Sequence, residues 1–153
     1  MNTLSEKLES FWLRQNIKLC PGAAEKELCA FETKYGIQFP EDFRQYLRSM
    51  NGFDESDHWM IDDNLITFLG LSQIMPLDKY WSPGFANSAG FFVFADYSIS
   101  AHVYAIQLRN AAVDRNQVVV IYDKLIEVAC SFTEFIEGYL KRDDAQLFPF
   151  TAG

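Results

Sequence analysis

A sharp corner between two helices, within residues 31–52, constrains the fold of this chain more than any other feature. Gly36 follows a helical stretch that ends near Tyr35, and glycine readily adopts the left-handed conformation found just past a helix C-terminus. Pro40 suits the first position of a second helix, because its φ angle is already helical and its missing N–H would be unpaired there. Asn51-Gly52 is a stop signal for that second helix. Its apolar side chains recur at i, i+3, i+4 and i+7, which predicts one buried face: Phe43, Tyr46, Leu47 and Met50.

Three other helices are predicted from similar spacing. One begins near Ser5 and ends around Gln15, and the helix that leads into the corner begins near Ala23. The last helix is the clearest, because Ser131 and Glu134 form a capping box at its start. Its buried stripe consists of Phe132, Phe135, Ile136, Tyr139 and Leu140.

Short apolar runs between the third helix and the last predict β-strands. No crossover helix fits between the later runs, so the pattern favours an antiparallel meander. The fold class is therefore α+β: N-terminal helices, an antiparallel sheet of about four to six strands and a C-terminal helix packed on the sheet. A single domain is expected over residues 1–153. The predicted strands are 65–71, 91–95, 102–108, 118–122 and 126–129.

The composition limits the class of partner. A formal net charge of -8 argues against nucleic acid or an anionic membrane as the partner, since both attract basic proteins. The three cysteines have unrelated spacings, which predicts neither a disulfide framework nor a zinc site and suits a reducing compartment. The chain carries no secretion-signal pattern and no run of eighteen apolar residues, so a cytoplasmic protein is expected.

Catalytic chemistry has few candidate residues. His58 lies in an acidic run that could bind a hard cation, although a solvated loop is the simpler interpretation. His102 follows Asp96 and two serines, Ser98 and Ser100, which would allow a hydrolytic group. The strand-turn-helix setting of a nucleophile elbow is missing, however, and Asp96 is better explained as a turn residue. We expect no enzyme, no catalytic residues, no cofactor and no metal.

Acidic residues are concentrated in one part of the chain. Between Glu41 and Asp63 there are seven acidic and two basic residues, a local balance of -5. A focused acidic surface speeds the association of a basic partner, and aromatic side chains within it can anchor an interface. The alternative is a solvated loop whose aromatic residues turn inward. The predicted partner-binding residues are Asp54, Glu55, Asp57, Trp59, Asp62 and Asp63.

A series of short motifs runs along residues 24–140, beginning in the helical corner. The motifs are Phe31-Glu32, Tyr35-Gly36-Ile37, Phe39-Pro40, Asn51-Gly52, Phe68-Leu69-Gly70-Leu71, Phe94-Ala95-Asp96-Tyr97, Val103-Tyr104-Ala105-Ile106, Val118–Tyr122 and Ser131-Phe132-Thr133-Glu134-Phe135. In their order and spacing they resemble the motifs of the SUKH superfamily, which groups a yeast regulator of cell-wall synthesis with bacterial immunity proteins. Ala101-His102 stands where many relatives carry Gly-Asp, which weakens any ligand role for that turn.

The resemblance implies a single α+β domain that binds a protein and performs no catalysis. It favours an immunity protein that neutralises a cognate toxin of the nuclease or deaminase class, and the acidic segment makes a basic toxin the expected partner. A regulatory or scaffolding module, like the cell-wall-regulator branch, is the alternative. A small hydrolase or metal-binding enzyme centred on Asp96 and His102 is a third hypothesis.

Overall fold

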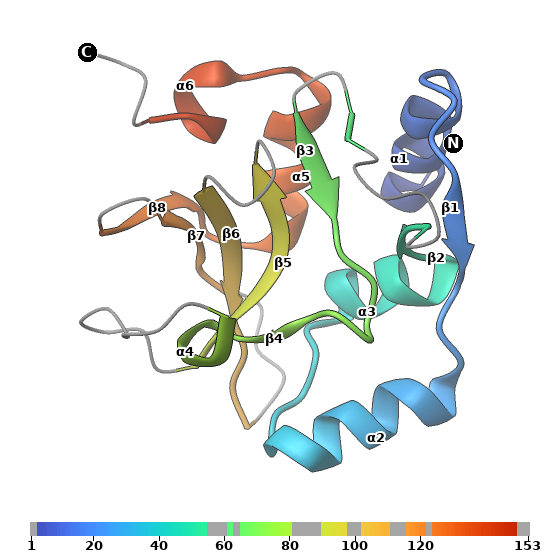
Figure 1. Ribbon diagram of the computed structural model, residues 1–153, viewed down its shortest axis with the longest axis vertical. Coiled ribbons are helices and arrows are strands. Elements are labelled where there is room, and N and C mark those ends of the chain that lie inside the picture. Colours follow the sequence, from blue (N-terminus) through green and yellow to red (C-terminus); the bar gives the residue numbers. More distant parts are fainter. Residues whose placement is uncertain are drawn as a thin grey trace.

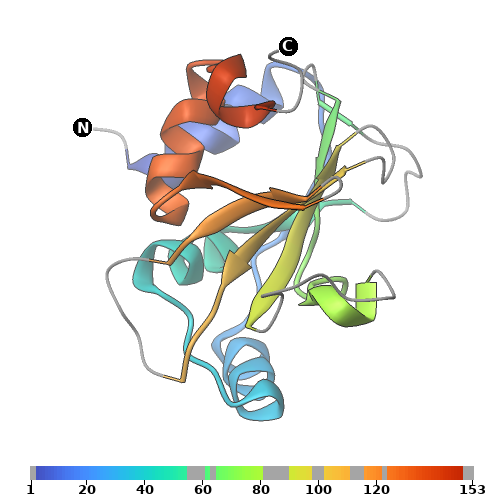
Figure 2. The ribbon, with the colours of Figure 1, turned by 90° about the vertical axis from the view of Figure 1, so that its left-hand side faces the viewer.

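The computed structural model describes residues 3–54, 61–62, 65–80, 90–97, 102–110, 116–121 and 124–149. α2 lies at one end of the long axis and α6 at the other (Figures 1 and 2). The described helices are α1 (Leu4–Leu13), α2 (Glu25–Tyr35), α3 (Glu41–Ser49), α4 (Leu77–Tyr80), α5 (Phe132–Leu140) and α6 (Asp144–Leu147). The described strands are β1 (Leu19–Pro21), β2 (Met50–Phe53), β3 (Ile66–Phe68), β4 (Met75–Pro76), β5 (Phe91–Tyr97), β6 (His102–Gln107), β7 (Val118–Ile121) and β8 (Leu125–Ala129).

The larger sheet is the predicted antiparallel meander. Its strands follow the order β3-β5-β6-β7-β8, with β4 also paired to β5, and every pairing is antiparallel. Helices α1 to α3 precede this sheet, and α5 packs against it after β8. The structure thus confirms the α+β class, the strand number and the packed C-terminal helix.

A second, two-stranded sheet is absent from the predicted elements. Strand β1 lies between the helix predicted to end around Gln15 and the helix predicted to begin near Ala23, and it pairs antiparallel with β2. β2 begins at Met50, directly where α3 ends, so Asn51-Gly52 is part of a strand and does more than stop a helix. Three residues are too few to show the alternation that identifies a strand, and only the pairing with β2 reveals β1.

Gly52 is required where β2 approaches the end of β3. Its φ angle is +76°, a left-handed backbone conformation that residues other than glycine rarely adopt. A Cβ atom at this position would lie 2.4 Å from the amide nitrogen of Gly70. The Asn51 side chain completes the junction, since its Oδ1 accepts a 2.6 Å hydrogen bond from the Leu71 N–H. The small sheet is thereby joined to the large one.

The helical corner forms as predicted, and two charged side chains hold it. Gly36 has a φ angle of +65° and caps α2. Pro40 is the N-cap residue of α3, one position before the first helical position predicted for it. The Glu32 carboxylate accepts a 2.8 Å hydrogen bond from the Phe39 N–H. Arg44 of α3 lies 2.9 Å from Glu32 and also pairs with Glu25, so it ties α2 to α3.

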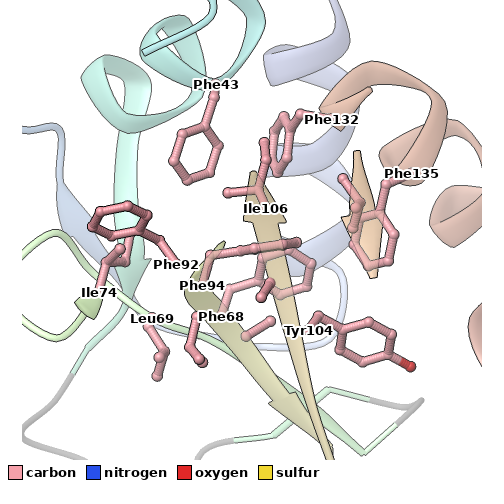
Figure 3. Close-up of a cluster of buried hydrophobic side chains, with 14 of the residues drawn as sticks. Phe43, Phe68, Leu69, Ile74, Phe92, Phe94, Tyr104, Ile106, Phe132 and Phe135 are labelled. Atoms are coloured by element: carbon pink, nitrogen blue, oxygen red, sulfur yellow. The ribbon is translucent and has the colours of Figure 1, made fainter. Parts of the chain in front are cut away.

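Aromatic side chains dominate the core between the helices and the sheet. Phe43 of α3 and Phe132 of α5 both point toward Phe94 of β5 (Figure 3). Their ring centroids lie 5.9 Å and 5.7 Å from that of Phe94, and 4.9 Å from each other. Burying one such ring stabilises a fold by about 1.5–3 kcal/mol. Phe43, from the α3 stripe predicted from sequence, thus packs against both the larger sheet and α5.

The free edge of β8 is partly covered by α6. The Gln146 side chain donates a 2.8 Å hydrogen bond to the Val128 carbonyl, a group that a neighbouring strand would otherwise use. Gly138 of α5 makes room for this contact, since a Cβ there would overlap the Gln146 side chain. The sequence reasoning did not predict α6, whose single turn is too short for a periodic pattern.

Candidate protein-interaction surface

Of the acidic run that follows β2, residues 54–63, the structure describes only Asp54 and residues 61–62. Asp54 follows β2 directly and is half-buried, and its N–H donates a 2.9 Å hydrogen bond to the Lys18 carbonyl beside β1. Asp62 precedes β3 and is buried. The predicted partner-binding residues Glu55, Asp57, Trp59 and Asp63 lie outside the described residues, as does His58.

Asp62 is buried, which corrects the prediction that it belongs to a partner-binding surface. Only 4% of Asp62 is exposed, and its carboxylate accepts hydrogen bonds from the Tyr139 hydroxyl and, at 2.9 Å, from the Ile66 N–H. The Tyr139 hydroxyl in turn accepts a 2.7 Å hydrogen bond from the Trp12 indole. Buried carboxylates are tolerated when they are hydrogen-bonded in this way. Asp62 therefore has a structural role, linking β3 to α5 and α1.

This environment changes the acidity of Tyr139. Burial raises the pKa of its hydroxyl, and the negative charge expected on Asp62 raises it further. The hydroxyl therefore stays protonated and continues to donate to the carboxylate. The signal that could have revealed Asp62 in the sequence is its place next to an apolar strand, but a local pattern cannot show a hydrogen-bond donor 77 residues away.

Other acidic residues in the same window also serve the fold. Asp42 accepts hydrogen bonds from the N–H and the hydroxyl of Thr133, at 2.9 and 2.8 Å, and so joins α3 to the start of α5. Arg44, one of the two basic residues counted there, is paired with Glu25 and Glu32 of α2. The charge summed over the sequence window is therefore not the charge of one surface.

A groove between α1 and β1 lies next to Asp54. It encloses about 580 Å³ and lies where α1, β1 and β2 come together at one side of the molecule (Figure 1). Leu13, at the end of α1, is 57% exposed at its rim. The complete lining is Glu9, Leu13, Ile17, Lys18, Leu19, Cys20, Pro21, Ser49, Met50 and Asp54. The groove thus places apolar side chains beside the point where the acidic run begins.

A second hollow, of about 690 Å³, lies along the helical corner. Its polar lining includes Glu32 and Arg44, which are already engaged with each other. The hydrogen bonds that Arg44 donates to Glu25 and to Glu32 raise the pKa of Arg44, so its positive charge is already balanced by two carboxylates of the protein. The hollow at the corner is consequently a weaker candidate for recognition than the groove beside Asp54.

The geometry of β5 and β6 argues against the hydrolase hypothesis. Residues opposite each other in an antiparallel pair share a face of the sheet, and successive residues alternate between faces. His102 is opposite Tyr97, whereas Asp96 is opposite Val103. Asp96 and His102 therefore point to opposite faces and cannot form a catalytic pair. Ser98 and Ser100 lie outside the described residues.

His102 has a packing role at the start of β6. Its ring stacks on Tyr97, with centroids 5.9 Å apart and planes at 18°. Partial burial lowers the pKa of its imidazole. Among the described residues, no group of three or more His, Cys, Asp and Glu side chains could hold a metal ion, and no helix has the length and apolar character needed to cross a bilayer.

The described residues thus form an α+β domain with an open groove between α1 and β1. The family model of the SMI1/KNR4 family (SUKH-1) matches residues 22–138, so the chain belongs to that family. This membership confirms the resemblance seen in the sequence motifs. Members of the family are generally immunity or regulatory proteins and not enzymes. A search of curated proteins found no match.

Proposed function

We propose that this chain is an immunity protein that binds and neutralises a basic toxin of the nuclease or deaminase class. The observation that carries the proposal is the position of Asp54, at the rim of the α1–β1 groove and at the start of an acidic run that continues in the sequence with Glu55 and Asp57. Family membership supports a protein partner. The net charge of -8 supports a basic one, which the cell would meet in the cytoplasm.

Neutralisation in this proposal is occlusion without chemistry. Toxins that act on nucleic acids need positive charge where the phosphate backbone binds. An acidic surface is attracted to the same positive charge and can cover it, and about 800 Å² per partner is ordinary for a specific complex. No cofactor and no catalytic residue of this chain is required.

A co-expression assay tests the proposal. The chain is expressed with toxin domains encoded beside its gene, and growth is compared with that of cells carrying Asp54→Lys, Glu55→Lys and Asp57→Lys together. We expect the triple variant to lose protection because its charge repels a basic partner. The matched control reverses three exposed acidic residues on other elements, Glu127, Glu137 and Asp144, and should still protect.

Unchanged protection by the triple variant at Asp54, Glu55 and Asp57 would exclude the acidic segment from the interface. Absence of protection by the unmodified chain would contradict the immunity function itself. The regulatory alternative has the same support from family membership, because the family includes both kinds of protein. It predicts a housekeeping partner and no toxin gene next to this one.

A further inference from the structure

The α1–β1 groove combines an apolar floor with an exposed apolar rim. Ile17 and Met50 are 4% and 1% exposed and close the floor, and Leu19 of β1 is half-buried beside them. Leu13 is 57% exposed although it is a large apolar residue. Single exposed leucines are common, but an exposed leucine continuous with other apolar groups in a groove is typical of an interaction site.

Leu13 is not needed for the core that α1 forms. The core-facing residues of this helix are Leu8 and Trp12, which are 1% and 0% exposed. Leu13 comes one residue later, about 100° further around the helix axis, and so projects away from that face. Only one other large apolar side chain in the described residues is comparably exposed, Leu65 at 43%, and it does not line the groove.

The charges at the groove limit what can fill it. Glu9 of α1 and Asp54 after β2 both line it, and Lys18 is the only basic residue in the lining. In the sequence Asp54 is followed at once by Glu55 and then by Asp57. A cationic segment is therefore attracted to this side of the groove, and an anionic one is repelled.

We infer that the α1–β1 groove binds a segment of the partner in which an apolar side chain is flanked by lysine or arginine. The apolar side chain packs on Leu13 and Leu19, and its cationic neighbours face Glu9 and Asp54. This inference deepens the proposed function and rests on it for the identity of the partner. It extends the interface to α1, which carries none of the partner-binding residues predicted from sequence.

Titration with defined peptides tests the chemistry of the groove directly. The probe is a peptide of three Lys-Leu-Lys-Ser repeats, and two comparison peptides replace its lysines by glutamate or its leucines by serine. We expect the Lys-Leu-Lys-Ser peptide to shift the amide NMR signals of Leu13, Leu19 and Asp54 in the isotope-labelled protein. Both comparison peptides should bind at least about tenfold more weakly.

Variants then assign the binding to named side chains. The double variant Glu9→Lys, Leu13→Ser should weaken binding of the Lys-Leu-Lys-Ser peptide by at least about tenfold. The single variant Leu13→Ala should show how much of this loss in affinity comes from the leucine side chain. Leu65→Ser is the matched control and should bind like the unmodified chain. Glu9 and Leu13 are exposed, so circular dichroism should report an unchanged fold. Equal binding of all three peptides, signal shifts confined to other elements, or unchanged binding by the double variant would overturn the inference.

The same double variant separates this inference from the immunity function. If the unmodified chain protects cells from a toxin and the Glu9→Lys, Leu13→Ser variant protects equally well, the groove is not part of the interface although the proposed function stands. If the unmodified chain protects against no toxin, the proposed function is wrong, and the peptide titration still decides whether the groove recognises cationic apolar segments.

Discussion

Asp62 is held inside the protein by hydrogen bonds from a side chain and from the backbone. Its carboxylate accepts from the Tyr139 hydroxyl and from the Ile66 N–H, and Trp12 donates to the same tyrosine oxygen. These groups come from α1, β3 and α5, so a single acidic residue connects three elements. An acidic residue in a polar stretch of sequence is thus part of the core.

Replacing Asp62 by alanine should destabilise the protein by roughly 2–4 kcal/mol, because the buried Tyr139 hydroxyl and Ile66 N–H would both lose their acceptor. Urea denaturation measures the change in the free energy of unfolding. Asp62→Asn is the control and should cost less, since the amide oxygen still accepts one hydrogen bond. A loss below about 0.5 kcal/mol for Asp62→Ala would contradict the structural role.

Tyr46 carries a different kind of buried polar group. It is 2% exposed, and its hydroxyl oxygen is buried without a hydrogen-bond partner. Tyr46→Phe should therefore leave the free energy of unfolding unchanged or increase it by up to about 1 kcal/mol, because no hydrogen bond is lost and an unsatisfied group is removed. The urea midpoint checks this, with Tyr139→Phe as a comparison that should be destabilising. A loss of stability in Tyr46→Phe would mean that its hydroxyl is hydrogen-bonded.

At the scale of elements, Asp42 holds two helices together at their N-terminal ends. It lies in the first turn of α3, and its carboxylate accepts hydrogen bonds from Thr133 in the first turn of α5. The N-terminal ends of both helices favour a nearby negative charge.

The capping box predicted for α5 forms in a modified way. Ser131 accepts from the Glu134 N–H, while the Glu134 carboxylate accepts from the Cys130 N–H.

Asp42→Ala should lower the free energy of unfolding by roughly 2–3 kcal/mol, since both the hydrogen bonds to Thr133 and the charge at the helix ends are lost. Thermal and urea unfolding measure the effect. Glu41→Ala is a matched control, because Glu41 is an exposed acidic residue in the same turn and should change stability much less. Equal effects of the two substitutions would show that only the charge of the first turn matters.

At the scale of the whole molecule, three buried tyrosines make the folded protein less stable at high pH. Burial is the main cause that raises the pKa of Tyr46, Tyr104 and Tyr139 above the ordinary value near 10. The folded protein therefore keeps these protons when the unfolded chain releases them. Unfolding then releases protons, and stability falls as the pH rises above about 10.

The expected slope is up to about 1.4 kcal/mol per pH unit for each tyrosine that remains protonated in the folded state only. Urea midpoints between pH 8 and pH 11 measure it, and Tyr46→Phe should flatten the decline by removing one titrating group. A stability that does not change above pH 10 would contradict the burial of these hydroxyls.

Local sequence patterns were sufficient for most elements of this fold. The stripe formed by Phe43, Tyr46 and Leu47, the glycine at position 36 and the apolar runs of the meander each predict a helix, a helix end or a strand from residues that are close in the sequence, whereas Met50, predicted in the same helix, begins β2. These features depend on side-chain period and backbone conformation, which neighbouring residues determine. The same motifs carry the family resemblance, and the family match confirms it.

The tertiary structure decided what the sequence patterns could not. β1 is recognisable only through its pairing with β2. The side-chain donor to the buried Asp62 is Tyr139, 77 residues away, whose hydroxyl in turn accepts a hydrogen bond from Trp12. Asp42 likewise has its partner 91 residues away. The sequence by itself determined the four longer helices, the meander, the family and a concentration of acidic residues. Which of those acidic residues face a partner and which hold the core depends on contacts between residues far apart in the chain, and periodicity carries no information about such contacts.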